Sequence, residues 1–210
     1  MRVIAMSDVH ARFDQFRAAT MPAADLCVIA GDLTNMGMRS PAEMQAMTDW
    51  LRSMAETYPH VLWIPGNHDI GMSDETLSIP NLHWMLDRTL SFDDPQGGGP
   101  MSVHGVSLTP AYETPQLMRL WERLTLDPEA EAAAYDFPYA DIVISHAPPY
   151  GLLDRAGGPH LGSRPLAKYI QKHQPKVVVC GHVHGAVGAL ALGRTRIFNL
   201  AKRWRLIDVE

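Results

Sequence analysis

The 210-residue chain contains only two cysteines, Cys27 and Cys180. Both lie within apolar stretches, where a thiol usually serves as a small, reduced core residue, so neither a disulfide framework nor a cysteine-type metal site is expected. A long uninterrupted hydrophobic run is also missing, because the longest apolar region, residues 177–192, contains His182 and His184. The sequence therefore predicts no transmembrane helix.

Basic clusters and a targeting signal are missing as well. The net charge is −5, from 18 basic and 23 acidic residues, and no basic run or aromatic–basic stripe indicates a nucleic-acid surface. The apolar stretch behind Arg2 covers only residues 3–6, which is too short for the core of a signal peptide. We therefore expect a cytoplasmic protein without a membrane or nucleic-acid partner, and the sequence does not indicate its oligomeric state.

The length and the pattern of the chain indicate a single α/β domain over residues 1–210. A chain of this size can bury a sizeable core but is short for two domains. Short apolar runs alternate with helical patterns, which predicts a mostly parallel sheet covered by helices. The runs that indicate strands are residues 3–6, 26–30, 61–64, 81–86, 89–92, 103–108, 141–145, 177–180, 187–192, 196–200 and 206–209.

The clearest helix signal begins at Ser40. This residue is a natural N-cap, Pro41 takes the first helical position, and Glu43 is placed to complete a capping box. Methionines then recur at helical spacing between residues 44 and 54, a stripe that we assign to the core, and the helix ends before Pro59. Further helices are expected over residues 13–22, after Thr114, after Asp127, and over Ser163–His173.

Five of the apolar runs are followed at once by side chains that can bind metal. These are Asp8 and His10 after residues 3–6, Asp32 after 26–30, Asn67 with His68 and Asp69 after 61–64, His146 after 142–144, and His182 with His184 after 177–180. Each signal alone is weak. Because the carboxyl ends of strands are where open α/β sheets place their sites, the joint pattern predicts one shared metal centre.

The types and spacing of these donors favour two ions. Asp8 and His10 are two residues apart, which on a continuing strand puts both side chains on one face, and His182 and His184 repeat the spacing around Val183. Seven donors exceed the needs of one tetrahedral ion but suit two ions that share a carboxylate. Oxygen and imidazole donors without thiolate are typical of Mn, Fe or Zn sites, among which we favour Mn.

The ordered motifs resemble those of the calcineurin-like metallophosphoesterase superfamily. They are Asp8-Val9-His10, Gly31-Asp32, Gly66-Asn67-His68-Asp69, His146 and Gly181-His182-Val183-His184, so that the resemblance covers residues 3–185. It implies two facing mixed β-sheets flanked by helices, an α/β/β/α sandwich. It also implies that one ion is held by Asp8, His10, Asp32 and His184, and a second by Asp32, Asn67, His146 and His182, with Asp32 bridging.

The resemblance further implies a hydrolase of phosphate esters. In such an enzyme two cations clamp the phosphoryl oxygens and lower the pKa of a bridging water, which supplies the hydroxide that attacks phosphorus. His68 is not a ligand in this assignment, so it is expected to protonate the leaving alkoxide or to stabilise phosphoryl charge. Asp69 is expected to hold the other ring nitrogen of His68, and the alternative is that Asp69 caps the turn.

The segment from His146 to Ser163 resembles small phosphodiesterases of this superfamily, so a small or nucleotide-like diester is the favoured substrate. Arg155, His160 and Arg164 could contact a phosphate or a base, or could be solvated loop residues. One alternative function is a phosphomonoesterase, including a phosphoprotein phosphatase. The other is a non-catalytic scaffold of the same fold, against which the complete ligand set argues.

Overall fold

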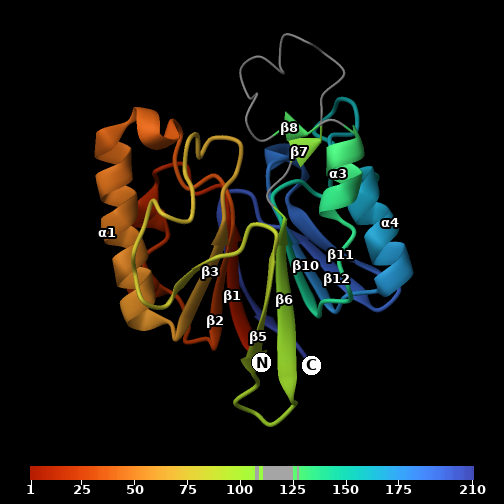
Figure 1. Ribbon diagram of the computed structural model, residues 1–210, viewed down its shortest axis with the longest axis horizontal. Helices are drawn as coiled ribbons and strands as arrows, with labels where there is room; N and C mark the ends of the chain where they lie inside the picture. The colour runs from red at the N-terminus through yellow and green to blue at the C-terminus, as the bar shows by residue number, and fades with distance from the viewer. Residues whose placement is uncertain (107–108, 111–124, 127) are drawn as a thin grey trace.

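The computed structural model describes residues 1–106, 109–110, 125–126 and 128–210 (Figure 1). Two sheets face each other at its centre. The first has the order β13 (Arg203–Asp208), β1 (Arg2–Ser7), β2 (Leu26–Ala30), β3 (His60–Ile64) and β4 (Leu82–Trp84). Strands β1 to β4 are parallel, and β13 pairs antiparallel with β1 at one edge.

The second sheet is mixed in the same way. Its order is β11 (Gly188–Leu192), β12 (Thr195–Asn199), β10 (Val177–Cys180), β9 (Ile142–Ser145), β6 (Pro100–Val106) and β5 (Arg88–Asp93). The four central strands are parallel, and β11 and β5 are antiparallel edge strands. A short parallel pair, β7 (Thr109–Pro110) and β8 (Thr125–Leu126), stands apart from both sheets.

Helices cover the outer face of each sheet. Helix α1 (Pro41–Thr57) packs on the first sheet, while α3 (Pro128–Ala134) and α4 (Arg164–His173) lie over the second (Figure 1). Short 3₁₀ turns complete the elements, namely η1 (Phe13–Gln15), η2 (Ala18–Thr20), η3 (Gly37–Arg39) and η4 (His184–Ala186). The expected α/β/β/α sandwich is therefore confirmed.

The central strands are continuous apolar runs in the sequence because the side chains on both of their faces are buried. In β2, the side chains of Leu26, Val28 and Ala30 enter the core between the sheets, whereas Cys27 and Ile29 face α1. A central parallel strand is buried on both faces, so both sets must be apolar. The two cysteines are buried and form no disulfide, as the sequence predicts.

The start of α1 shows half of the expected capping box. The Ser40 hydroxyl accepts a hydrogen bond from the N–H of Glu43 at 3.4 Å, but the Ser40 N–H donates to the carbonyl of Gly37. The Glu43 carboxylate binds the preceding loop at Asn35 and Met36 instead. The expected reciprocal hydrogen bond, from the N–H of Ser40 to the Glu43 carboxylate, was therefore wrong, because the backbone amides of Asn35 and Met36 bind that carboxylate instead.

Other differences are local. The stretch after the first strand forms the two 3₁₀ turns η1 and η2, and not the single helix expected over residues 13–22. The helix expected after Thr114 and the residues 107–108 of the expected strand 103–108 lie outside the described residues, as does Asp127, although α3 begins at Pro128. Within the described part of the chain, no helix is long and apolar enough to cross a membrane.

Candidate metal centre

The strands that carry the predicted ligands face one another across the two sheets. Strand β1 lies opposite β10, and β2 lies opposite β9. The loops that follow them are tied together, since the N–H of Asp8 donates to Gly31, that of His10 donates to Asp32, and that of Gly181 donates to His146. Both sheets therefore deliver their polar strand ends to one place.

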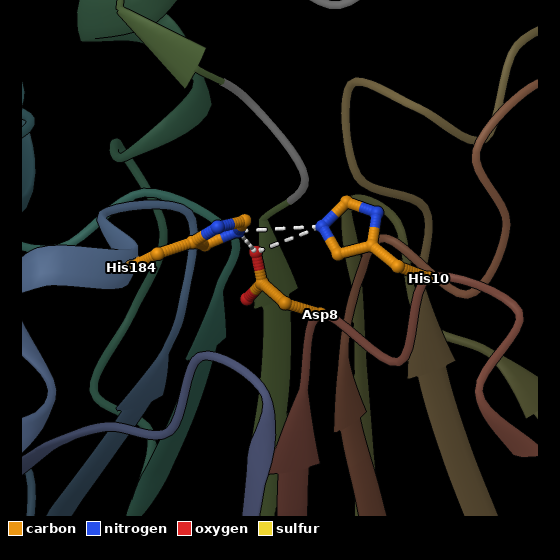
Figure 2. A group of neighbouring side chains, drawn as sticks. All are labelled: Asp8, His10 and His184. Carbon is orange, nitrogen blue, oxygen red and sulfur yellow. Dashed lines mark hydrogen bonds and ion pairs between the residues drawn. The ribbon is translucent and has the colours of Figure 1, made fainter.

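The first group of ligand atoms is gathered around the Asp8 carboxylate (Figure 2). Oδ1 of Asp8 lies 2.8 Å from Nε2 of His184 and 3.7 Å from Nε2 of His10. The two imidazole nitrogens are 3.3 Å apart, and Nε2 of His10 lies 3.7 Å from Oδ2 of Asp32. The four residues that the family resemblance assigns to one ion are thus brought together with their donor atoms facing one another.

A second group is gathered around the side-chain oxygen of Asn67. Nε2 of His146 and Nδ1 of His182 each lie 3.0 Å from Oδ1 of Asn67. Nε2 of His146 is also 3.5 Å from Oδ2 of Asp32, the same oxygen that faces His10. One carboxylate oxygen therefore adjoins both groups, which is the arrangement that a bridging ligand needs.

Contacts behind the donor atoms fix their directions. The other oxygen of Asp8, Oδ2, accepts from the N–H of His182 at 3.0 Å, and Oδ1 of Asp32 accepts from the N–H of His68 at 2.8 Å. Nδ1 of His146 lies 2.8 Å from the carbonyl oxygen of Ala30, so Nδ1 carries the hydrogen and Nε2 is the atom offered to the site. Such supporting bonds orient the ligands of metal sites.

The way Asp8 and His10 converge differs from the expected strand geometry. Strand β1 ends at Ser7, and Asp8 and His10 have φ angles of 55° and 47°. Asp32 and His182 also have positive φ, at 55° and 66°. The left-handed region is sparsely used by residues other than glycine, and such strain clusters at functional sites. Turns, and not a strand pleat, therefore bring these ligands together.

The centre contains two buried carboxylates, Asp8 and Asp32, which interact with the neighbouring histidines. Burial alone would raise the pKa of Asp8, yet hydrogen bonds from neighbouring histidines hold that pKa well below its usual range. Burial would lower the pKa of His146, but Asp32 and Asp8 raise it to about 9. These carboxylates, 2% exposed or less, thus create a field that attracts positive charge. Three groups of Asp and His donors in this centre could hold a metal ion, and its oxygen and imidazole donors fit Mn, Fe or Zn.

His68 adjoins the first group of ligands. Its ring meets that of His10 edge-on at 4.9 Å between centroids, and a ring nitrogen lies within 4.8 Å of the donors of His10 and Asp32. Nδ1 of His68 lies 3.0 Å from the carbonyl oxygen of Asn35, which can only accept. Nδ1 therefore carries a hydrogen, and Nε2 is the ring atom through which a proton can be exchanged.

The Asp69 carboxylate has a different partner from the one expected. It accepts hydrogen bonds from the N–H groups of Gly66, Leu33 and Thr34 at 2.9–3.1 Å, and from the Thr34 hydroxyl at 3.0 Å. The hypothesis that Asp69 holds the ring of His68 was wrong, because the carbonyl of Asn35 takes that position. Asp69 joins two loops and caps the turn, as in the alternative interpretation.

Two supporting residues do not stand out in the sequence analysis. Nδ2 of Asn199 donates to the carbonyls of Val183, at 3.0 Å, and Leu153, at 3.1 Å, and so holds the segment between the last two histidine ligands. A signal for it exists, because Asn199 is a polar residue near the carboxyl end of the apolar run 196–200. Asn35 has no such signal, since its role lies in its backbone carbonyl.

The loop after His146 binds mostly to itself. Nε of Arg155 donates to the carbonyl of Gly158 at 2.9 Å, and Nδ1 of His160 lies 2.8 Å from Asp154. The guanidinium of Arg164 stacks 3.6 Å above the ring of Tyr150. Arg155, His160 and Arg164 thus stabilise the loop, and these contacts are with its own residues, not with the metal ligands.

With the fold and the centre in place, comparison with known proteins gives the family. The profile of the calcineurin-like phosphoesterase family matches residues 1–186, and the chain belongs to that family. It is accordingly a metallophosphoesterase, a hydrolase that acts on phosphate ester bonds.

Similar proteins agree with this assignment. The chain is 27% identical to a UPF0046 protein of Caenorhabditis elegans over 222 residues, which cover 96% of this chain and 70% of that protein. It is 26% identical to the human metallophosphoesterase domain-containing protein 1, covering 94% of this chain and 65% of the relative. The structure of TT1561 from Thermus thermophilus shares the fold, with a TM-score of 0.63, 18% identity and coverage of 100% and 99%.

Proposed function

We propose that this protein is a phosphodiesterase that hydrolyses small or nucleotide-like diesters with two divalent metal ions, Mn being the first choice. The observation that carries the proposal is the shared oxygen: Oδ2 of Asp32 adjoins both groups of donors, with His10 on one side and His146 on the other. The ions would be held by Asp8, His10, Asp32 and His184, and by Asp32, Asn67, His146 and His182. When bound, they would neutralise the phosphoryl oxygens and lower the pKa of a water.

His68 would act on the leaving group. Its Nδ1 is held by the Asn35 carbonyl, so Nε2 can deliver a proton to a departing alkoxide. The buried carboxylates would hold the ions and take no part in proton transfer, because their oxygens are occupied by backbone amides and histidines.

The choice of a diester rests on charge. A monoester carries one more negative charge than a diester, and extra cations usually balance it. Arg155, in the loop after His146, and Arg164, the first residue of α4, are turned to other partners, namely a carbonyl and the ring of Tyr150. This supports a substrate with a single negative charge.

A paired assay tests the proposal. The protein, stripped of metal and resupplied with Mn, Fe or Zn, would be compared on bis-p-nitrophenyl phosphate and p-nitrophenyl phosphate. We expect the larger kcat/KM on the diester, and none after chelation. A clear preference for p-nitrophenyl phosphate would make the protein a monoesterase. No turnover of either ester with any of these metals would favour the scaffold.

A further inference from the structure

Glu43, in the first turn of α1, holds the loop that supports His68. Its Oε2 accepts from the backbone N–H of Asn35 at 2.7 Å and from that of Met36 at 3.3 Å, and Oε1 accepts from Nδ2 of Asn35 at 3.3 Å. A charged acceptor makes such bonds stronger than a neutral one would. Glu43 is half-buried, which reduces screening by solvent.

These bonds control the direction of one carbonyl group. The carbonyl of Asn35 and the N–H of Met36 belong to the same peptide unit, which is planar and trans, so the two groups point in opposite directions. The N–H points at the Glu43 carboxylate, and the carbonyl oxygen lies 3.0 Å from Nδ1 of His68. Holding one end of this peptide unit therefore aims the other end at the imidazole.

Asn35 also connects to the first group of ligands. Its Nδ2, which Glu43 holds, donates to the carbonyl of His10 at 3.4 Å. The same carboxylate therefore acts on the loop of His68 and on the loop of His10. No metal ligand touches Glu43 directly in these contacts, so its influence passes through Asn35.

The geometry points to Glu43 as a positioning residue for His68, acting through the Asn35 peptide unit to fix the tautomer and orientation of the imidazole. This inference rests on the proposed function in one respect, because it takes His68 to be a reactive group. In a capping box Glu43 would stabilise only the helix. In this structure the carboxylate instead accepts hydrogen bonds from Asn35 and Met36, in the loop that supports His68.

The experiment is a double-mutant cycle with two substrates. Glu43→Ala, His68→Asn and the double variant would be assayed with Mn on bis-p-nitrophenyl phosphate and on a dinucleoside monophosphate, whose leaving group is an alkoxide. Glu43→Gln keeps one acceptor oxygen for the amides, and Glu56→Ala removes the same charge from an exposed site on the same helix. Metal content is measured for each variant, and NMR of the ring nitrogens reports the tautomer of His68.

We expect Glu43→Ala to keep its metals, to shift the His68 ring signals, and to lose about 10–100-fold on the alkoxide substrate, as outer supporting residues do. Glu43→Gln should lose less and Glu56→Ala nothing. In the His68→Asn background Glu43→Ala should lose far less than it does when His68 is present. Additive losses, or unchanged ring signals, would overturn the inference. An unchanged rate of His68→Asn on both substrates would overturn it as well, whereas the proposed function fails separately, if the unaltered protein hydrolyses neither diester.

Discussion

Asp32 is the residue on which the dinuclear proposal depends, because a single oxygen of its carboxylate faces both groups of donors. We expect Asp32→Ala to lose both ions and nearly all activity. His184→Ala, which removes a donor from one group only, should keep the ion of the other group. Metal analysis by mass spectrometry measures the difference. Two ions per chain with near-normal turnover in Asp32→Ala would rule out bridging.

His68 is expected to matter in proportion to how poor the leaving group is. A general acid contributes about 10²–10⁴-fold, most of it when an alkoxide departs, whereas a nitrophenolate leaves without a proton. His68→Asn should therefore keep both metals, lose heavily on a dinucleoside monophosphate, and lose little on bis-p-nitrophenyl phosphate. Equal losses on both substrates would assign His68 to charge stabilisation, and loss of metal would make it a ligand.

At the scale of single residues, the metal-binding side chains could be predicted from the sequence, but the contacts that orient them could not. Each of the seven predicted ligands stands where an apolar run turns polar, a change visible in the sequence alone. The partner of Asp69 lies some 35 positions away at Leu33 and Thr34, and the partner of His68 is a backbone carbonyl. Neither contact leaves a local pattern, because it depends on how two loops meet.

The elements followed the sequence closely where burial decides them. Strands such as β2 and β10 start and end where predicted, since both their faces must be apolar. The region after β1 did not, because Phe13 and Phe16 give a stripe too short to require a continuous helix. Glu43 shows a further limit of sequence analysis. Its motif predicted a role in capping helix α1, whereas in the structure the Glu43 carboxylate supports the preceding loop.

The turn after β3 requires a glycine at Gly66. A Cβ atom there would lie 2.7 Å from Cγ of Asp32 and closer still to its backbone, so Asp32 or the turn must shift. We expect Gly66→Ala to fold with reduced stability and to bind metal at least ~10-fold more weakly, as for other changes around ligands. Gly158→Ala is the matched control, because its Cβ would meet nothing within 4 Å. Equal metal affinity in both variants, by titration, would contradict this.

Stability of the whole molecule should fall in mild acid, partly through His104. This histidine of β6 is 5% exposed and stacks on Phe137, Thr89 bonds its Nδ1, and its Nε2 has no hydrogen-bond partner in the described part of the chain. Burial lowers the pKa of His104 to about 4 from 6.5. Between these values the unfolded chain binds a proton that the folded chain does not, so the free energy of unfolding decreases as pH falls.

The decrease from His104 should be about 2 kcal/mol between pH 7 and pH 5, since each pKa unit corresponds to about 1.4 kcal/mol. Urea unfolding of the metal-free protein at pH 7 and pH 5 measures it, with His104→Gln as the control that cannot titrate. As the solution becomes more acidic, the unfolding free energy of the protein with His104 should fall relative to that of His104→Gln. A constant difference would show that His104 titrates normally.

The seven predicted ligands come from both sheets: Asp8, His10, Asp32 and Asn67 follow strands of the first, and His146, His182 and His184 follow strands of the second. Bound ions would therefore be a cross-link between the two halves of a sandwich whose two cysteines form no disulfide. By mass action, free metal at 100 times its dissociation constant adds about 2.7 kcal/mol to folding. The supply of metal would therefore determine how stably the two sheets are held together at the edge that carries the ligands. It would thus also determine the resistance of the chain to proteolysis, even when no substrate is present.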